Sequence, residues 1–323
     1  MKVLVTGENG FIARNLVKSF DKVGEKVVTL TSDNLEKTPS GELCVWRNSE
    51  AAWSKALSEN EIGLVVHNAA MVGTDVVALN PHEATHSNVT GTYTICRAAN
   101  SLGIPVCYMG TTVIYDTSLY QDRQIVEAST LGPNTLYGAH KLASEFVVKS
   151  HCDRWLIMRP LFAYGGVGDM NSLIAKSFFA ALDESVDSID MFLDPAKTKD
   201  YLHVEDFCDS VALACHLGLW GYDFNIAAET PVEVGKIVDM MSEVSGLDIQ
   251  KKIKWHPQTD YLGNHLLSCD KFRNITAWKP SYSLREGIMS SWESILNNEG
   301  KDYNPLKHLQ EAERKNIDLT QFF

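Results

Sequence analysis

The sequence has no excess of basic residues, no long apolar run and no paired cysteine motif. Its 323 residues contain 29 Lys and Arg against 41 Asp and Glu, a formal net charge of −12. This balance argues against a nonspecific binder of nucleic acid or of anionic membranes, although it permits a local basic pocket for a phosphate. No apolar stretch reaches the roughly 18 to 20 residues that a transmembrane helix needs. We therefore expect no nucleic-acid partner and no membrane partner.

Cysteine is present, but not in a pattern that indicates disulfides. The seven Cys residues are scattered, odd in number and without a C-x-x-C pair, which is typical of a reduced protein. The chain opens with MKVLVTG, which reads as a strand running into a glycine turn rather than as a signal peptide. We therefore expect a cytoplasmic protein.

The first two-thirds of the chain alternates short β-branched runs with helical stretches. Strands are expected at 2–6, 26–31, 43–46, 64–68, 106–109 and 155–158, and helices at 11–22, 51–58, 81–101 and 134–150. This alternation predicts an α/β protein with a Rossmann-type, doubly wound parallel sheet. The pattern weakens later in the chain, which indicates a smaller C-terminal α/β substrate-binding lobe. The predicted domains are 1–164 plus about 203–228, then about 165–202 plus 229–296, with a charged tail at 297–323.

A glycine-rich turn follows the first strand and opens a helix. Gly7 permits a tight turn, Gly10 lets the backbone approach a pyrophosphate, and the helix N-terminus attracts the anion. Contacts to NAD or NADP are assigned here to Gly7, Asn9, Gly10, Phe11 and Ile12. The second strand ends in Thr31-Ser32, where an NAD-binding protein usually places an acidic residue for the ribose. Thr31 and Ser32 are assigned to the ribose, and the choice between NAD and NADP stays open.

A tyrosine and a lysine stand four residues apart in a predicted helix. Tyr137 and Lys141 therefore lie on one face, one turn apart. An ammonium near a phenol stabilises the phenolate and makes it a general acid or base near neutral pH. His140 points elsewhere and is expected to face solvent or an interface. Thr111 follows the strand at 106–109, at the edge of a parallel sheet where ligands bind.

Together these motifs resemble those of the extended short-chain dehydrogenase/reductase family, its NAD-dependent epimerase/dehydratase group. The matching segments, which span about residues 1–296, are VLVTG with Gly10, VHNAA at 66–70, NVTGT at 88–92, Thr111, the Tyr137–Lys141 pair, MRP at 158–160, DYLHVED at 200–206 and FNIA at 224–227. Within the family the pattern is most like that of the nucleotide-sugar 4-epimerases.

The resemblance implies roles for individual residues. Thr111, Tyr137 and Lys141 would be catalytic, with Tyr137 exchanging the proton of a substrate oxygen. Further cofactor contacts would come from Asn68, Ala69, Ala70, Asn88, Tyr137, Lys141 and Pro160, and substrate contacts from Thr112, Val113, Phe162, Asn171 and Lys199. It also implies a nucleotide-sugar substrate and a homodimer formed through the helices at 81–101 and 134–150.

The sequence departs from the family at several informative positions. Dehydratases of the group carry an Asp-Glu pair where this chain has Thr112 and Val113, so elimination of water lacks its usual acid and base. Lys199 replaces an Arg, and the Asn that 4-epimerases use near the sugar is missing from the segment 161–163. We therefore expect 4-epimerase-type oxidation and reduction at a sugar carbon. The alternative is an NAD(P)H-dependent ketosugar or other carbonyl reductase, ahead of a dehydratase or a non-catalytic dinucleotide-binding relative.

One further motif suggests a metal. His82-Glu83-Ala84-Thr85-His86 spells H-E-x-x-H, which can bind zinc. It follows Pro81 at the start of a predicted packed crossover helix, and no third-ligand pattern follows it. We expect no metal site.

Overall fold

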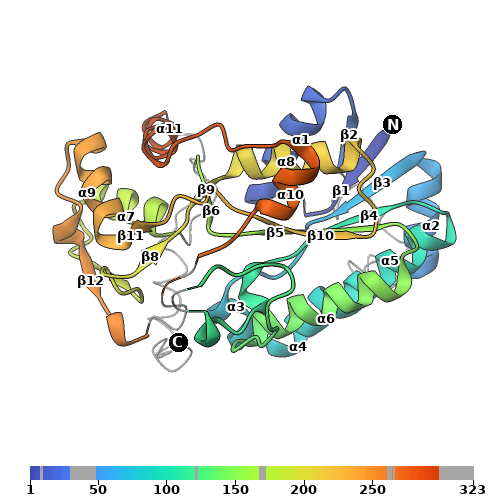
Figure 1. The fold of residues 1–323 in the computed structure, drawn as a ribbon, viewed down its shortest axis with the longest axis horizontal. Helices are drawn as coiled ribbons and strands as arrows, with labels where there is room; N and C mark the ends of the chain where they lie inside the picture. Colours follow the sequence, from blue (N-terminus) through green and yellow to red (C-terminus); the bar gives the residue numbers. More distant parts are fainter. Residues whose placement is uncertain are drawn as a thin grey trace.

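A six-stranded sheet forms the centre of the molecule (Figure 1). The structure is a computed structural model and describes residues 1–7, 10–29, 49–120, 123–166, 172–259, 264 and 266–297. The sheet order is β10-β5-β4-β3-β1-β2, and every neighbouring pair is parallel. These strands are β1 (Lys2–Val5), β2 (Lys26–Thr29), β3 (Ile62–His67), β4 (Val106–Met109), β5 (Trp155–Pro160) and β10 (Tyr222–Ile226). The predicted parallel Rossmann-type sheet is confirmed, whereas the strand expected at 43–46 lies outside the described residues.

Helices cover both faces of this sheet (Figure 1). One face is covered by α1 (Phe11–Lys22), α8 (Val204–His216) and α10 (Asp270–Thr276), and the other by α2 (Glu50–Glu59), α5 (Gly91–Ser101) and α6 (Leu136–His151). Strand β3 shows why both faces are apolar. Leu64 and Val66 pack into the core beneath α1 and α8, while Val65 packs into the core beneath α2 and α5 because successive side chains of a strand point to opposite faces.

The crossover from β3 to β4 is not the single helix expected at 81–101. It consists of α3 (Thr74–Leu79), α4 (Pro81–Thr85), a π-helical turn (His86–Thr90) and α5. Within that turn the carbonyl of Asn88 accepts hydrogen bonds from the Thr92 hydroxyl at 2.6 Å and from the Ser144 hydroxyl at 2.8 Å. Single π-helical turns between α-helices are common at functional sites.

A second, smaller lobe follows β5 and occupies the left of Figure 1. Its elements are α7 (Leu173–Leu182), β7 (Ile189–Met191), β8 (Thr198–Lys199), β11 (Val232–Glu233), α9 (Val234–Ser245), β12 (Ile253–Trp255) and α11 (Leu284–Leu296). Phe178, Ile237 and Ile288 belong to a core of its own. Strands β6 (Ala163–Tyr164) and β9 (Leu202–His203) pair where the chain passes between the lobes. The predicted division into two domains, with its limits, stays a prediction.

Short 3-10 turns lie at Thr112–Ile114, Thr117–Leu119, Gln250–Lys252 and Pro257–Thr259. No helix among the described residues combines the length and apolar character that a membrane span requires. Of the seven cysteines, the six in the described residues are buried free thiols.

Candidate functional site

The glycine turn lies where the sheet order reverses, between β1 and β3. Gly7 has φ +75°, a conformation that side chains rarely adopt, and a Cβ there would lie 2.9 Å from the Cα of Ala69. The Gly10 amide donates to the Gly7 carbonyl at 2.8 Å, and a Cβ on Gly10 would lie 3.0 Å from that oxygen. Gly10 is also the N-cap residue of α1, whose N-terminus has no side-chain cap. This cradle fits a pyrophosphate at a topological switch point.

The loop after β3 is tied to the glycine turn. The backbone amides of Asn68 and Ala69 donate to Oγ1 of Thr6, at 3.1 and 3.0 Å. The side-chain amide nitrogen of Asn68 would lie 3.5 Å from a Cβ on Gly10. Asn68, Ala69 and the glycine turn are therefore brought together as one wall of the site.

His67 holds Thr6, and through it the loop after β3, in position. It is buried, with its Nδ1 2.9 Å from Oγ1 of Thr6 and its Nε2 3.0 Å from Oγ1 of Thr92. Because the Thr92 hydroxyl donates to the carbonyl of Asn88, it accepts from Nε2, and Nδ1 accepts from Thr6. Burial, together with the charge of Lys141, lowers the pKa of His67 to about 3, so the ring is neutral. His67 belongs to the VHNAA motif at 66–70, but the sequence does not show that it is hydrogen-bonded to Thr6 and Thr92.

Asn88 acts on the same loop. Its side-chain oxygen accepts from the amide of Met71 at 2.7 Å, and its nitrogen donates to the carbonyl of Met71 at 2.9 Å. Its own carbonyl accepts from Ser144 on α6. The side chain of Asn88 therefore holds the loop after β3 in place, and its backbone carbonyl links this segment to α6.

Helix α6 carries the Tyr–Lys pair. Tyr137 is half-buried in its first turn, and Lys141 is only 3% exposed. The ammonium of Lys141 donates to the carbonyl of Met109, the last residue of β4, at 2.7 Å, and lies 4.7 Å from the Tyr108 ring centroid. Burial lowers the pKa of Lys141 to about 8, and the Glu145 carboxylate partly opposes this shift.

The segment carrying Thr111 packs against the first turn of α6. A Cβ on Gly138 would lie only 2.7 Å from the carbonyl oxygen of Val113, so the glycine within the Tyr137–Lys141 motif permits this approach. Oγ1 of Thr111 accepts from the amide of Val113 at 3.4 Å. The fold thus brings the strand-end threonine and the Tyr–Lys helix together.

The assigned substrate residues that the structure describes fall into two places: Thr112 and Val113 follow β4, whereas Phe162 and Lys199 lie close to each other where the chain passes between the lobes. Thr112 is buried and Val113 is half-buried. Phe162 has φ +34° and stacks on Tyr201 with ring centroids 5.5 Å apart. The Lys199 ammonium is fully buried, 6.0 Å from the Phe162 ring centroid.

Four of the remaining assigned residues lie in described parts of the chain. Phe11 and Ile12 begin α1, Ala70 follows Ala69, and Pro160 ends β5; all four are half-buried. Asn9, Thr31, Ser32 and Asn171 lie outside the described residues.

Two expectations about histidines can be compared with the structure. His140 does not face solvent: it is 5% exposed, and its Nε2 lies 2.9 Å from the Thr85 hydroxyl on α4. The packing of α6 against the crossover buries it. His82 and His86, from the H-E-x-x-H motif, are exposed. Across the described ranges, no cluster of three or more His, Cys, Asp and Glu side chains is placed to hold a metal.

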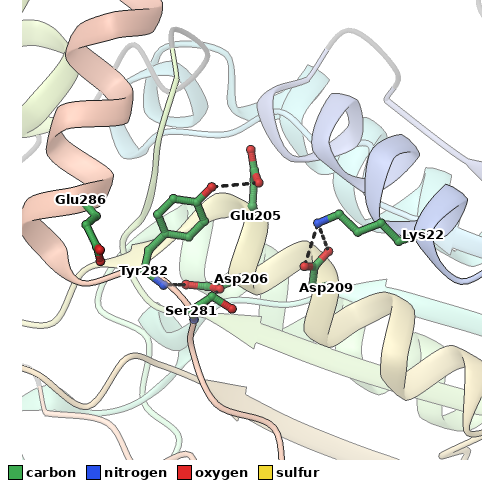
Figure 2. Close-up of a pocket in the computed structure, with 7 residues that line it drawn as sticks. All are labelled: Lys22, Glu205, Asp206, Asp209, Ser281, Tyr282 and Glu286. Atoms are coloured by element: carbon green, nitrogen blue, oxygen red, sulfur yellow. Dashed lines mark hydrogen bonds and ion pairs between the residues drawn. The ribbon is translucent and has the colours of Figure 1, made fainter.

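A separate hollow of about 480 Å³ opens at the N-terminus of α8 (Figure 2). Its walls carry Lys22, Glu205, Asp206, Asp209, Ser281, Tyr282 and Glu286. The Asp206 carboxylate accepts from the amides of Ser281 and Tyr282, and the Lys22 ammonium is paired with Asp209 at 2.9 Å. Four carboxylates against one ammonium make this hollow unfavourable for a phosphate. Its polar groups hold the segment before α11 onto α8.

A parallel Rossmann-type sheet with a glycine turn at its switch point is typical of dinucleotide-binding α/β proteins. A family model described as the NAD dependent epimerase/dehydratase family matches residues 3–227. The chain belongs to this family, and the prediction of an enzyme of the extended short-chain dehydrogenase/reductase type is confirmed.

Similar proteins with different reactions match nearly the whole chain. A UDP-glucose 4-epimerase of Halalkalibacterium halodurans is 26% identical over 90% of this chain and 95% of its own length. A human dTDP-D-glucose 4,6-dehydratase is 23% identical over 92% and 90%. The solved structure of MoeE5 in complex with UDP-glucose and NAD has a TM-score of 0.79 and 22% identity, and covers 93% of this chain and 100% of that chain. These similarities do not separate an epimerase from a dehydratase.

Proposed function

We propose that the protein is an NAD(P)-dependent nucleotide-sugar enzyme that oxidises and reduces a sugar carbon, as a 4-epimerase does. The observation that carries the proposal is the docking of α6 on the end of β4. Lys141 is held at Met109, and the first turn of α6 lies against the segment that follows Thr111. A phenol, an ammonium and a hydroxyl thus stand on neighbouring elements, which supports the proposal.

The proposed roles follow from the chemistry of these groups. Tyr137 takes a proton from the sugar hydroxyl as it is oxidised and returns it when the carbonyl is reduced. Thr111 donates a hydrogen bond to the same oxygen. The ammonium of Lys141 stabilises the phenolate and contacts the nicotinamide ribose. Bound NAD(P) would supply the hydride acceptor for the oxidation and the hydride donor for the reduction.

The segment after β4 favours epimerase-type chemistry over dehydration. Its 3-10 turn, Thr112–Ile114, carries no carboxylate, and Thr112 is 2% exposed. Loss of water from a sugar needs an acid and a base near the leaving hydroxyl, and the dehydratases take theirs from these positions. The Thr111, Tyr137 and Lys141 set is sufficient for reversible oxidation.

The remaining binding assignments are proposed on the same basis. Gly7, Gly10, Asn68 and Ala69 would hold the NAD pyrophosphate and neighbouring atoms, since they form the cradle at the switch point. The relatives' nucleotide-sugar names, and the structure with bound UDP-glucose and NAD, support a nucleotide-sugar substrate. Its binding would extend toward Phe162 and Lys199 at the lobe junction.

A homodimer formed through α5 and α6 is also proposed. Both helices expose large apolar side chains: Tyr93 is 42% exposed on α5 and Phe146 is 60% exposed on α6. Because α5 and α6 pack against each other, we propose that these side chains belong to one apolar surface, of the kind that marks interaction sites. A dimer there would hold the helix that carries Tyr137 and Lys141.

The test begins with the cofactor. The purified protein is denatured and the released nicotinamide nucleotide is identified. Stoichiometric NAD is expected for an epimerase that recycles its own hydride, whereas an empty protein that prefers NADPH would favour a reductase. The protein is then incubated with UDP-glucose, and UDP-galactose is measured. Tyr137→Phe should abolish this conversion, and unchanged turnover in that variant would refute the site.

A further inference from the structure

One buried arginine on β5 is hydrogen-bonded to helix α6, to the segment that follows Thr111 and to strand β10. Arg159, near the end of β5, is 2% exposed. Its Nε and Nη2 donate to the two carboxylate oxygens of Glu145, at 2.9 and 2.7 Å. Nη1 donates to the phenol oxygen of Tyr115 at 2.8 Å, and Nη2 donates to Asp223 of β10 at 3.0 Å. The planar fork of a guanidinium fixes the directions of these bonds.

The first of these partners belongs to the catalytic helix. Glu145 lies one turn after Lys141 and two turns after Tyr137 on α6, so all three share the face toward the sheet. A Cβ on Gly110 would lie 2.7 Å from Oε1 of Glu145 and 2.9 Å from Cγ of Arg159. The ion pair therefore touches the backbone of the residue immediately before Thr111.

The second partner closes the segment that carries Thr111. Tyr115 ends the 3-10 turn that Thr111 begins, and its ring is 2% exposed. While its oxygen accepts from Arg159, its hydroxyl donates to the side-chain oxygen of Asn225 at 2.8 Å. Thr111 thus lies between two points, Gly110 and Tyr115, that contact the Arg159–Glu145 pair. Neither end can shift without breaking a buried hydrogen bond or meeting the ion pair.

We propose that Arg159 is a positioning residue that sets the Thr111 hydroxyl against Tyr137 and Lys141, by binding the helix through Glu145 and the Thr111 segment through Tyr115. This inference rests on the proposed function, because it presumes that Thr111 and Tyr137 act on one substrate oxygen. Active-site groups must be held within about 0.5 Å of their productive geometry. A misplacement of about 1 Å from a distant change can cost about a hundredfold in rate.

Tyr115→Phe tests the proposal with the smallest change, since it removes one oxygen and keeps the buried ring. Tyr164→Phe is the matched control: Tyr164 is 1% exposed, and its hydroxyl donates to the Leu284 carbonyl at 3.2 Å in the smaller lobe. We expect Tyr115→Phe to lower kcat for UDP-glucose about tenfold or more, with KM and NAD affinity within about twofold of the parent. Tyr164→Phe should lower thermal stability comparably and leave kcat within about twofold. Equal kcat in the two variants would overturn the proposal.

A double-mutant cycle separates positioning from general loosening. If Tyr115 acts by placing Thr111, Tyr115→Phe should change kcat by less than about twofold in a Thr111→Val background. If Tyr115→Phe lowered kcat by the same factor in the parent and in the Thr111→Val background, Tyr115 would not act through Thr111, and the proposal would be refuted. The crystal structure of Tyr115→Phe gives a readout that needs no turnover: a shift of Thr111 Oγ1 relative to Lys141 Nζ of more than about 0.5 Å is expected, and an unchanged distance contradicts it.

Comparing Tyr137→Phe with Tyr115→Phe separates failure of this proposal from failure of the proposed function. Unchanged turnover in Tyr137→Phe removes the catalytic assignment itself. Lost turnover in Tyr137→Phe, together with parent-like kcat in Tyr115→Phe, removes only the positioning role of Arg159.

Discussion

Three glycines allow the dinucleotide cradle to be tested with one kind of substitution. Gly7 and Gly24 both have positive φ, +75° and +77°, but only Gly7 is crowded. A Cβ on Gly24 meets nothing within 4 Å, whereas one on Gly7 lies 2.9 Å from the Cα and 3.1 Å from the amide nitrogen of Ala69. Gly10 has an ordinary φ of −72°, and its Cβ would lie 3.0 Å from the Gly7 carbonyl. Alanine at Gly24 therefore tests backbone strain alone, alanine at Gly7 adds a steric conflict, and alanine at Gly10 tests the approach of the pyrophosphate.

The expected magnitudes follow from these contacts. Gly24→Ala should lower the free energy of unfolding by about 1 kcal/mol, the cost of a left-handed alanine. Gly7→Ala adds a conflict with backbone atoms that cannot rotate away, about 1 to 3 kcal/mol more. Gly10→Ala avoids the left-handed cost and should lose about 1 kcal/mol or less. It should nevertheless weaken NAD binding at least about tenfold, which corresponds to about 1.4 kcal/mol, because its methyl group occupies the pyrophosphate approach.

The assay pairs urea unfolding with calorimetric titration of NAD into the folded protein. Gly24→Ala should bind NAD like the parent despite its lower stability, so weakened binding cannot be ascribed to instability alone. Gly7→Ala should lose both stability and binding. Parent-like NAD affinity in Gly10→Ala would refute the assignment of the glycine turn to the cofactor, whatever the stability of that variant.

Two further predictions concern the helix that carries the Tyr–Lys pair. Because burial lowers the pKa of Lys141 to about 8, its ammonium is present below that pH and lost above it, so kcat should fall as pH rises through about 8; a flat kcat profile from pH 7 to 9 would contradict the role of the ammonium in stabilising the Tyr137 phenolate. Phe146→Glu places a charge on the 60% exposed aromatic of α6 and should convert a dimer into a monomer in light scattering, whereas Leu182→Glu, at a 45% exposed position on α7, should not.

Much of the fold is readable from the chain because its signals are local. The strand at Val106–Met109 and the helix at Phe11–Lys22 have the predicted limits, since buried parallel strands read as short apolar runs and glycine punctuates their ends. The crossover from β3 to β4 cannot be predicted in the same way. Its π-helical turn at His86–Thr90 coincides with side-chain hydroxyls that bind the carbonyl of Asn88, and one of these comes from Ser144, 56 residues away in sequence. No periodicity within 81–101 contains that information.

The candidate site divides in the same way. Tyr137 and Lys141 are visible as a spacing, because one helical turn brings them together regardless of the rest of the fold. Arg159 and His67 lie inside recognisable segments, yet their functions depend on partners from other elements, so a linear pattern gives them no role. The sequence alone shows that the acidic pair of the dehydratases is missing. It does not show that the residues in its place form a 3-10 turn that packs against Gly138.

Phe162 shows how the fold adds meaning to a departure already visible in the sequence. The segment 161–163 lacks the asparagine that 4-epimerases place near the sugar, and the structure shows that Phe162 has a left-handed φ of +34°. Asparagine tolerates such a backbone, whereas phenylalanine adopts it only under strain of about 1 to 3 kcal/mol. The stack on Tyr201 and the buried ammonium of Lys199 nearby are interactions that offset this strain. Phe162 therefore offers an aromatic face where the 4-epimerases offer an amide, so we expect any substrate contact at this position to be a ring contact rather than an amide hydrogen bond.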